Sequence, residues 1–339
     1  MSTRMLFVIS SPRSGSTMLE RMLESHSEIL GGPEPHLLTP LAHLGVWDNV
    51  EKAPYDHVLA ADAQKLFIER LPGREQDYWD ACRAYCDVLY GRLLDANGTS
   101  TVCLDKTPAY GLVLPFMMKI FPDAKYVVLT RHPLATFSSY ANSFFDGDYE
   151  VAQKYNPLLN RYVPAIAKFL RQEEVPYLHV AYEDLVADPE TWMEKIYGYI
   201  GVPFEKETID YGDRKRDGKS EKGLGDPIGV NRHSRPSASG AHKWVEEFGA
   251  EPAKKSFMEG VIAQLDPADL ETLGYPIETL WKPLEEAEGK TFRTMTQSLS
   301  AYRLQRKAIV KLRGVAQSSG LIRKGLRKIR LVCDVLLRE

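Results

Sequence analysis

The chain has 339 residues, of which 44% are hydrophobic and 26% charged, and its formal net charge is −3. Such a chain can bury a full core as one large domain or two smaller ones. A net negative charge offers no general attraction to nucleic acid, so we expect no nucleic-acid partner. No apolar run approaches the roughly 20 residues of a membrane span. An apolar strand begins within the first residues and leaves no room for a signal peptide, so we expect a cytoplasmic protein.

The four cysteines are too scattered to predict a zinc site or a secreted disulfide framework. Cys82, Cys86, Cys103 and Cys333 form no CxxC pair. We therefore expect reduced structural thiols and no bound metal.

Apolar runs of strand length alternate with helical patterns along the chain. Four runs, each bounded by a turn or a proline, predict buried strands at residues 5–9, 101–106, 125–133 and 177–182. Helical patterns cover Ser16–Glu28 and Tyr78–Leu94. A further helix is predicted from Pro189, because Asp188 is a typical N-cap residue and Gly201 a typical C-terminal stop.

Strands separated by helices, without hairpins, predict an α/β fold with a parallel sheet flanked by helices. Ligands bind such sheets at the carboxyl ends of the strands. The four predicted strand ends carry the sequences SSPRSGST, DKTP, TRHP and YED. We expect the functional chemistry at that edge of the sheet.

The loop after the first strand has the length of a nucleotide-triphosphate loop but lacks its lysine. When Gly15 is aligned with the second glycine of GxxxxGK[ST], Ser10 takes the place of the first glycine and Ser16 that of the lysine. The backbone N–H groups at the start of the next helix can still hold an anion. Arg13 supplies a cation inside the loop instead. This arrangement suits an anion that needs less neutralisation than a triphosphate.

The stretch SSPRSGSTML resembles the 5′-phosphosulfate loop of sulfotransferases that use 3′-phosphoadenosine 5′-phosphosulfate (PAPS) as cosubstrate. The resemblance implies a P-loop-like sulfotransferase fold and transfer of a sulfuryl group without a metal ion. A sulfuryl group carries one charge, and an arginine in the loop can follow the bridging oxygen as charge grows on it. The donor-binding residues implied here are Arg13, Ser14, Gly15, Ser16 and Thr17.

The stretch KYVVLTRHPLATFSSY resembles the 3′-phosphate segment of the same family. In that segment a strand ends in an arginine and a serine follows eight residues later, and here these are Arg131 and Ser139. The arginine offers a fork to the nucleotide 3′-phosphate. Tyrosylprotein sulfotransferases have another arginine four residues after the serine, where this chain has Ser143. Some contacts with the 3′-phosphate must therefore come from elsewhere.

Sulfuryl transfer to a hydroxyl requires a base and cations near the departing phosphate. Glu34, in GGPEPHLL, matches the glutamate that acts as catalytic base in tyrosylprotein sulfotransferases, and polyketide-associated bacterial sulfotransferase domains carry a similar sequence. Lys106, in LDKTP, matches a catalytic lysine of the tyrosylprotein enzymes. On chemical grounds His36 and His132 could also act as bases, but neither matches a histidine base of the family by position, and we expect an orienting or structural role for both. With Arg13, Glu34 and Lys106 form the expected catalytic set.

Further along the chain, Tyr182 in AYEDL matches a family tyrosine that contacts the adenosine end of the nucleotide. The stretch RHSRPSASGAHKW resembles a late family segment that closes over the 3′-phosphate, which implies Lys243 and Arg235 as further ligands. Composition alone leaves two interpretations of residues 212–240: a surface loop, or a lid that closes over an anion.

Two other functions stay open at the sequence level. Residues 101–105 also resemble a Walker B strand that ends in a magnesium ligand, Asp105, so a P-loop kinase acting on a small hydroxyl compound is the alternative enzyme. The other alternative is a non-catalytic module that binds a nucleotide or a membrane.

The resemblance runs from Met5 to about Tyr275, so we predict a sulfotransferase domain over residues 1–275 and a basic helical C-terminal extension over 276–339. Residues 303–339 hold 11 Lys/Arg and 2 Asp/Glu. Their apolar residues at helical spacing are Ile322, Leu326, Ile329, Cys333 and Leu336. This segment could contact an acidic membrane, a partner or its own domain.

The sequence does not identify the acceptor. We expect residues 38–100 to build the acceptor pocket for a small-molecule hydroxyl compound. An apolar cluster suits a lipid, polyketide or phenolic hydroxyl, although its members could equally be core; they are Leu37, Leu38, Leu41, Leu44 and Trp47.

Overall fold

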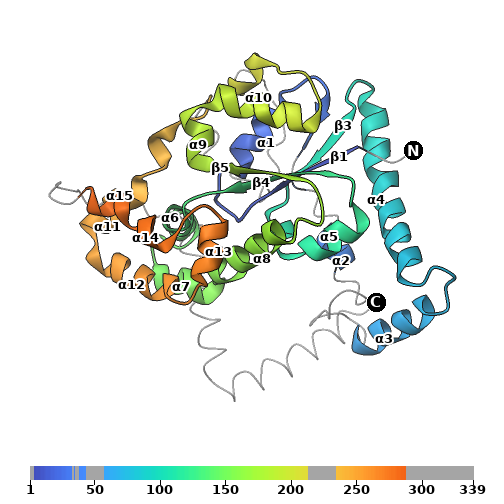
Figure 1. The fold of residues 1–339 in the computed structure, drawn as a ribbon, viewed down its shortest axis with the longest axis horizontal. Coiled ribbons are helices and arrows are strands. Elements are labelled where there is room, and N and C mark those ends of the chain that lie inside the picture. The colour runs from blue at the N-terminus through green and yellow to red at the C-terminus, as the bar shows by residue number, and fades with distance from the viewer. Residues whose placement is uncertain (1–3, 33, 35–37, 43–56, 213–233, 288–339) are drawn as a thin grey trace, which may run out of the picture.

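The computed structural model of the protein describes residues 4–32, 34, 38–42, 57–212 and 234–287. Within them, five parallel strands form one sheet in the order β2-β3-β1-β4-β5 (Figure 1). The strands are β1 (Met5–Ile9), β2 (Ile29–Leu30), β3 (Val102–Asp105), β4 (Lys125–Thr130) and β5 (Tyr177–Ala181). The predicted parallel α/β fold is confirmed, and all four predicted strands are present. Only the two-residue strand β2 was not predicted.

Strand β1 lies at the centre of the sheet because all five of its residues are apolar and can be buried on both faces. Phe7 is in register with Asp105 on one side and with Tyr126 on the other. The side chains alternate between two core clusters: Phe7 belongs to one cluster and Leu6 and Val8 to the other. This alternation separates the two helical layers.

One layer of helices contains α4 (Glu75–Asn97), α5 (Leu114–Ile120) and α8 (Leu158–Gln172), and the other contains α1 (Ser16–Glu24), α9 (Tyr182–Ala187) and α10 (Pro189–Ile200) (Figure 1). Every crossover returns the chain to the same end of the sheet, so the loops after β1, β3, β4 and β5 meet at one edge. The remaining α-helices are α2 (Leu38–Ala42), α3 (His57–Ile68), α6 (Pro133–Phe144), α7 (Tyr149–Tyr155), α11 (Lys243–Ala250), α12 (Pro252–Ile262), α13 (Pro267–Thr272), α14 (Ile277–Leu280) and α15 (Lys282–Glu285).

Some helix ends were predicted correctly from local sequence, and others were not. The Asp188 side chain accepts a hydrogen bond from the Thr191 N–H at 3.2 Å, and Gly201 ends α10 with φ 80°, as predicted. The first helix is shorter than predicted and ends at Glu24 rather than Glu28. The Ser25 hydroxyl donates to the Arg21 carbonyl, and the chain turns there toward β2.

The packing of the main core continues beyond residue 275. Leu280 and Leu284, from α14 and α15, are buried in the same cluster as Phe7. Residues 288–339, which make up most of the predicted extension, lie outside the described residues, so the boundary after residue 275 stays a prediction. Cys82, Cys86 and Cys103 are free and buried. No helix among the described residues combines the length and the apolar composition that crossing a membrane requires.

Candidate active site

The loop between β1 and α1 depends on a glycine for two reasons. Gly15 has φ 89°, in the left-handed region that favours glycine. A Cβ atom at this position would also lie 2.5 Å from Cδ2 of Tyr182, the first residue of α9. The Tyr182 ring therefore packs directly on the loop, and a larger residue at position 15 would push it away.

This loop has the features of an anion site. The Ser11 and Ser14 hydroxyls share a hydrogen bond of 2.6 Å, which tightens the turn. No side chain caps the N-terminus of α1, where Ser16 and Thr17 are the first two residues. The first N–H groups of a helix have no partner within the helix, and the helix dipole adds positive potential there. An anion in the loop would bond to these groups.

Arg13 and Arg131 join the two sequence motifs. Nε of Arg13 donates to the Ser139 hydroxyl at 3.1 Å. Arg131 donates through Nη1 to the Arg13 carbonyl at 3.0 Å and through Nη2 to the Gly240 carbonyl at 2.8 Å. The loop after β1, the end of β4 and the α6 serine are thus within hydrogen-bond distance of one another.

The guanidinium of Arg131 also lies over an aromatic ring. Its Cζ atom is 4.5 Å from the centroid of the Tyr182 ring, the same ring that packs on Gly15. Burial lowers the pKa of Arg131, but an arginine stays charged in proteins. A fixed positive charge therefore lies beside the loop. In this structure the N–H groups of the Arg131 guanidinium donate to backbone carbonyls.

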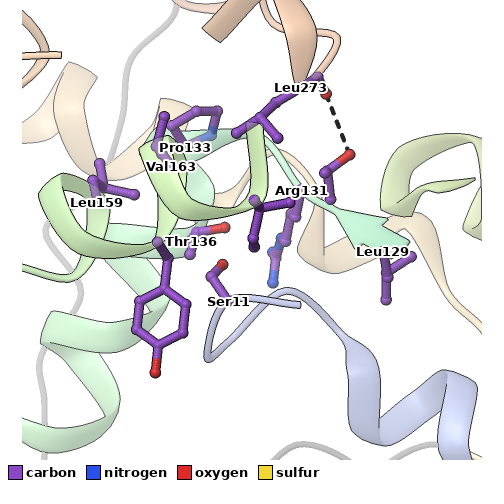
Figure 2. A pocket seen from close by; sticks show the side chains of 11 residues that line it. Ser11, Leu129, Arg131, Pro133, Thr136, Leu159, Val163 and Leu273 are labelled. Carbon is purple, nitrogen blue, oxygen red and sulfur yellow. Dashed lines mark hydrogen bonds between the residues drawn. The ribbon is translucent and has the colours of Figure 1, made fainter. Parts of the chain in front are cut away.

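A small cavity lies behind the loop (Figure 2). The side chains of Ser11, Arg131 and Thr136 converge there, against apolar residues of α8 (Figure 2). Its volume is about 20 Å³, which is room for about one water and not for a nucleotide.

A buried ion cluster lies beside the loop, at the end of β3. The Lys106 side chain has no exposed surface, and its ammonium group contacts the carboxylates of Glu34 and Glu20. The distance from Lys106 Nζ to Glu20 Oε2 is 3.2 Å. The structure thus brings the two predicted residues Glu34 and Lys106 together, and adds a second carboxylate.

Glu20 is the residue that the sequence analysis missed. It lies one turn after Ser16 on α1, is 2% exposed and is flanked by the buried residues Leu19 and Met22. A charged residue at a buried helical position needs a partner, because an isolated buried charge is costly. That conflict was the available signal, but the partner, Lys106, is distant in sequence.

The Asp105 carboxylate is held by three hydroxyl groups. Its buried carboxylate accepts hydrogen bonds from the hydroxyls of Tyr90 at 2.5 Å, Tyr110 at 2.9 Å and Thr107 at 3.0 Å. Burial, together with the charge of Asp105, raises the pKa of both tyrosines, so both remain donors. These three hydroxyls fix the end of β3, and they leave the kinase interpretation without its expected magnesium ligand.

His132 has a structural environment. Its Nε2 donates to the Leu280 carbonyl at 3.1 Å, and its ring stacks on Trp244 at a centroid distance of 4.7 Å. Burial lowers the pKa of His132 to about 4. A neutral histidine held in this way joins α6 to the last helices. The other histidine candidate, His36, lies outside the described residues.

Two of the predicted donor-binding residues, Arg235 and Lys243, take no part in the hydrogen bonds that join the two sequence motifs. Arg235 is exposed and forms an ion pair with Asp210 at 3.5 Å, and Lys243 is exposed at the first residue of α11. Most of the glycine-rich stretch 212–240 lies outside the described residues, from 213 to 233. Its end is described, and there the Gly240 carbonyl binds Arg131. The assignments of Arg235 and Lys243 stay predictions.

Comparison with known proteins agrees with this geometry. A family model described as "Sulfotransferase family" matches residues 6–206. Nodulation protein NoeE of Sinorhizobium fredii is 32% identical over 133 residues, which is 39% of this chain and 30% of that protein. The protein-tyrosine sulfotransferase of Drosophila melanogaster is 21% identical over 211 residues, which is 61% of this chain and 40% of that protein.

Among solved structures, the sulfotransferase domain from the olefin synthase of Synechococcus PCC 7002 is 26% identical. It covers 72% of this chain and 88% of that domain, with a TM-score of 0.47. The matches span less than half the length of the two curated relatives named above.

Replacing the buried lysine should destabilise the fold. Lys106→Met removes the cation between two buried carboxylates, so we expect a loss of about 3 kcal/mol in the free energy of unfolding at pH 7. Urea denaturation at pH 7 measures the loss. Lys255→Met, which breaks an exposed ion pair with Glu259, is the control and should change little. Equal effects of the two variants would contradict the role of the cluster.

His132 should make stability depend on pH. Its pKa is about 4 when folded and 6.5 when free, so the unfolded chain binds more protons between these values and stability is lost as the pH falls through them. From pH 7 to pH 5 we expect His132 to contribute a loss of about 2 kcal/mol. His132→Phe keeps a ring on Trp244 but cannot take up a proton, so its unfolding free energy should fall less over this range. Parallel pH profiles for the two proteins would exclude this contribution.

Proposed function

We propose that this chain, which belongs to the sulfotransferase family, transfers the sulfuryl group of PAPS to a hydroxyl group of a small-molecule acceptor. The product nucleotide is then adenosine 3′,5′-bisphosphate. The observation that carries the proposal is the contact between the two predicted anion sites, in which Arg13 bonds to Ser139 and Arg131 bonds to the Arg13 backbone. PAPS carries one anionic group at the 3′ carbon and another at the 5′ carbon of a single ribose, so the two sites that bind these groups must lie close together.

The donor would be held by the backbone and hydroxyls of Ser14–Thr17 at its 5′ end and by Ser139 and Arg131 at its 3′ end. Arg131 would exchange a carbonyl partner for the 3′-phosphate, because a charged oxygen is the stronger acceptor. Tyr182 offers its ring next to both sites, which suits a contact with the nucleoside. The exposed cations Arg235 and Lys243 would reach the 3′-phosphate only after a movement of their segment.

The catalytic proposal assigns a role to each member of the ion cluster. The Glu34 carboxylate takes the proton of the acceptor hydroxyl, and the hydroxyl oxygen then bonds to sulfur. The bond between sulfur and the bridging oxygen breaks, and the electron pair stays on the phosphate. Arg13 stabilises that departing oxygen, and Lys106 stabilises the sulfuryl oxygens.

The contact between Lys106 and Glu34 implies that donor binding comes before proton transfer. While Lys106 binds Glu34, the carboxylate is occupied and is a poor base. A sulfuryl group in the site offers the ammonium another anionic partner, which would free Glu34 for the acceptor. Glu20 would hold the ammonium group of Lys106 in place throughout, because its carboxylate is a second anionic partner and is fixed on helix α1. Glu20 is therefore a positioning residue in this proposal.

The acceptor side is only partly described. Leu38 and Leu41 are buried in the main core, while the apolar residues Leu37, Leu44 and Trp47 lie outside the described residues. Burial raises the pKa of Tyr162 to about 12, and the Glu34 carboxylate adds to the rise. This tyrosine stays protonated near the proposed base and is a candidate contact for the acceptor. A lipid, polyketide or phenolic hydroxyl remains our proposal for the acceptor class.

Glu34→Gln tests the base. With labelled PAPS and a panel of hydroxylated acceptors, turnover should fall at least about 100-fold, because an amide cannot take the proton. Calorimetry with adenosine 3′,5′-bisphosphate should show nearly unchanged affinity. A variant that loses nucleotide binding would contradict the assigned role, and magnesium-dependent consumption of ATP by the wild type would favour the kinase instead.

Glu20→Gln tests the positioning role. The variant keeps the shape of the side chain but releases Lys106 from one carboxylate, so kcat should fall about 10- to 100-fold. The affinity for adenosine 3′,5′-bisphosphate should change little, because Glu20 is not among the proposed donor-binding residues. The matched control is Glu24→Gln, one turn later on α1, with unchanged kcat expected. Similar losses in both variants would show that only general damage to α1 was measured.

A further inference from the structure

Helix α4 has apolar residues on two sides, and only one side is covered. Its inner side packs into the main core through Trp79, Cys82, Cys86 and Tyr90. Its other apolar side consists of Tyr85, Val88, Leu89 and Leu93, which are 38 to 52% exposed. These four residues, spaced as on one helical face, are here named the α4 outer face.

The exposed apolar surface extends along and beyond this helix. Ala81, Ala84 and Ala96 are also exposed on the same side of α4. The preceding helix α3, which contacts α4, exposes Leu66 at 58% and Phe67 at 64%. Contiguous exposed apolar surface of this kind marks a docking site.

The charge around the α4 outer face favours a basic occupant. Asp77 and Asp95 lie eleven and seven residues from Val88 on its side of the helix, and one cation on the same side, Arg92, lies between them, four residues after Val88. Over its whole length α4 has five acidic and two basic residues. The chain outside residues 303–339 has a net charge of about −12, given −3 overall and +9 within that segment. A second α4 outer face would meet like charge, whereas a cationic segment would meet opposite charge.

The chain itself contains a segment of the required chemistry. Between residues 322 and 336, five apolar residues recur at intervals of four and three, which is the spacing of one helical face. The residues between them include five cations, Arg323, Lys324, Arg327, Lys328 and Arg330. As a helix this apolar row would be about 21 Å long, and the row from Ala81 to Ala96 is about 22 Å long.

We propose that residues 322–336 dock as an amphipathic helix on the α4 outer face of the same chain. The apolar row would cover Tyr85, Val88, Leu89 and Leu93, and the flanking cations would face the acidic side chains of α4. The described chain ends at Ala287 in the core beyond α15, and roughly 34 residues separate it from Ile322. Fully extended they span up to about 115 Å, more than the diameter of about 50 Å expected for a domain of this size.

Tethering favours the same chain over a second copy, because an attached segment has an effective concentration in the millimolar range. This inference does not depend on the proposed reaction, because no residue of the α4 outer face is among the predicted donor-binding or catalytic residues. It concerns the side of α4 that does not pack into the main core.

A single cysteine substitution tests the docking. Cys333 lies on the apolar row, and the other three cysteines are buried. In the full chain carrying Leu89→Cys, mild oxidation should form a disulfide with Cys333 within one chain, identified by peptide mass and by unchanged monomer size. The matched control is Asp80→Cys, nine residues earlier and half a turn round α4, where at least tenfold slower cross-linking is expected.

Other outcomes would overturn the proposal. Cross-linked dimers that form at high protein concentration and vanish on dilution would assign the segment to a second copy. Equal cross-linking at both positions would show an undocked segment. Absence of the Leu89→Cys cross-link, with sedimentation of the wild-type chain on phosphatidylserine vesicles, would assign it to a membrane.

A second measurement avoids the added cysteine. In the full chain carrying Leu326→Glu and Ile329→Glu, hydrogen–deuterium exchange of the peptide 84–96 should rise several-fold, because the covering helix is lost. Exchange of α10 should stay the same. Unchanged exchange of the peptide 84–96 would also overturn the proposal.

Discussion

The geometry of the site depends on the two hydrogen bonds that Arg131 donates to backbone carbonyls. One carbonyl belongs to Arg13 in the loop after β1, and the other to Gly240, more than a hundred residues later. The same guanidinium lies over Tyr182, whose ring packs on Gly15. Arg131, which directly follows β4, therefore fixes the relative positions of the loop after β1, the start of α9 and the segment that contains Gly240.

The second ordering element is the buried cluster of Glu20, Lys106 and Glu34. One ammonium group between two carboxylates leaves a net negative charge in a poorly solvated place. Such a cluster is stable only while the Lys106 ammonium group is present, because the two carboxylates would otherwise repel each other. Arg13 and Arg131, the cations next to the loop, likewise donate hydrogen bonds to oxygen atoms of the protein. An anionic donor would thus compete with partners that already hold these cations in nearly the right place, which reduces the reorganisation required on binding.

Much of the fold and part of the site could be predicted from local sequence. The apolar run of β1, the caps Asp188 and Gly201, and the loop containing Gly15 are signals carried by neighbouring residues. Glu20 could not be paired with Lys106, because helical periodicity reports burial without naming the partner. The Gly240 carbonyl left no signal at all, since any residue has a carbonyl. Asp105 was ambiguous until Tyr90, from α4, was seen to occupy its carboxylate.

The position of the loop cation explains how a loop without the usual lysine can work. A lysine after the second glycine would lie on the helix and reach forward along it, whereas Arg13 lies before Gly15, in the turn itself. Its φ of 71° is in the left-handed region, which costs about 1–2 kcal/mol for a residue other than glycine. The bond from Arg131 to the Arg13 carbonyl stabilises this conformation, and the bond from Arg13 to Ser139 directs the side chain toward α6. The cation thereby lies between the two predicted anion sites rather than beyond the end of one. That placement suits an anion whose departing oxygen lies close to the ribose, and it suits a triphosphate poorly.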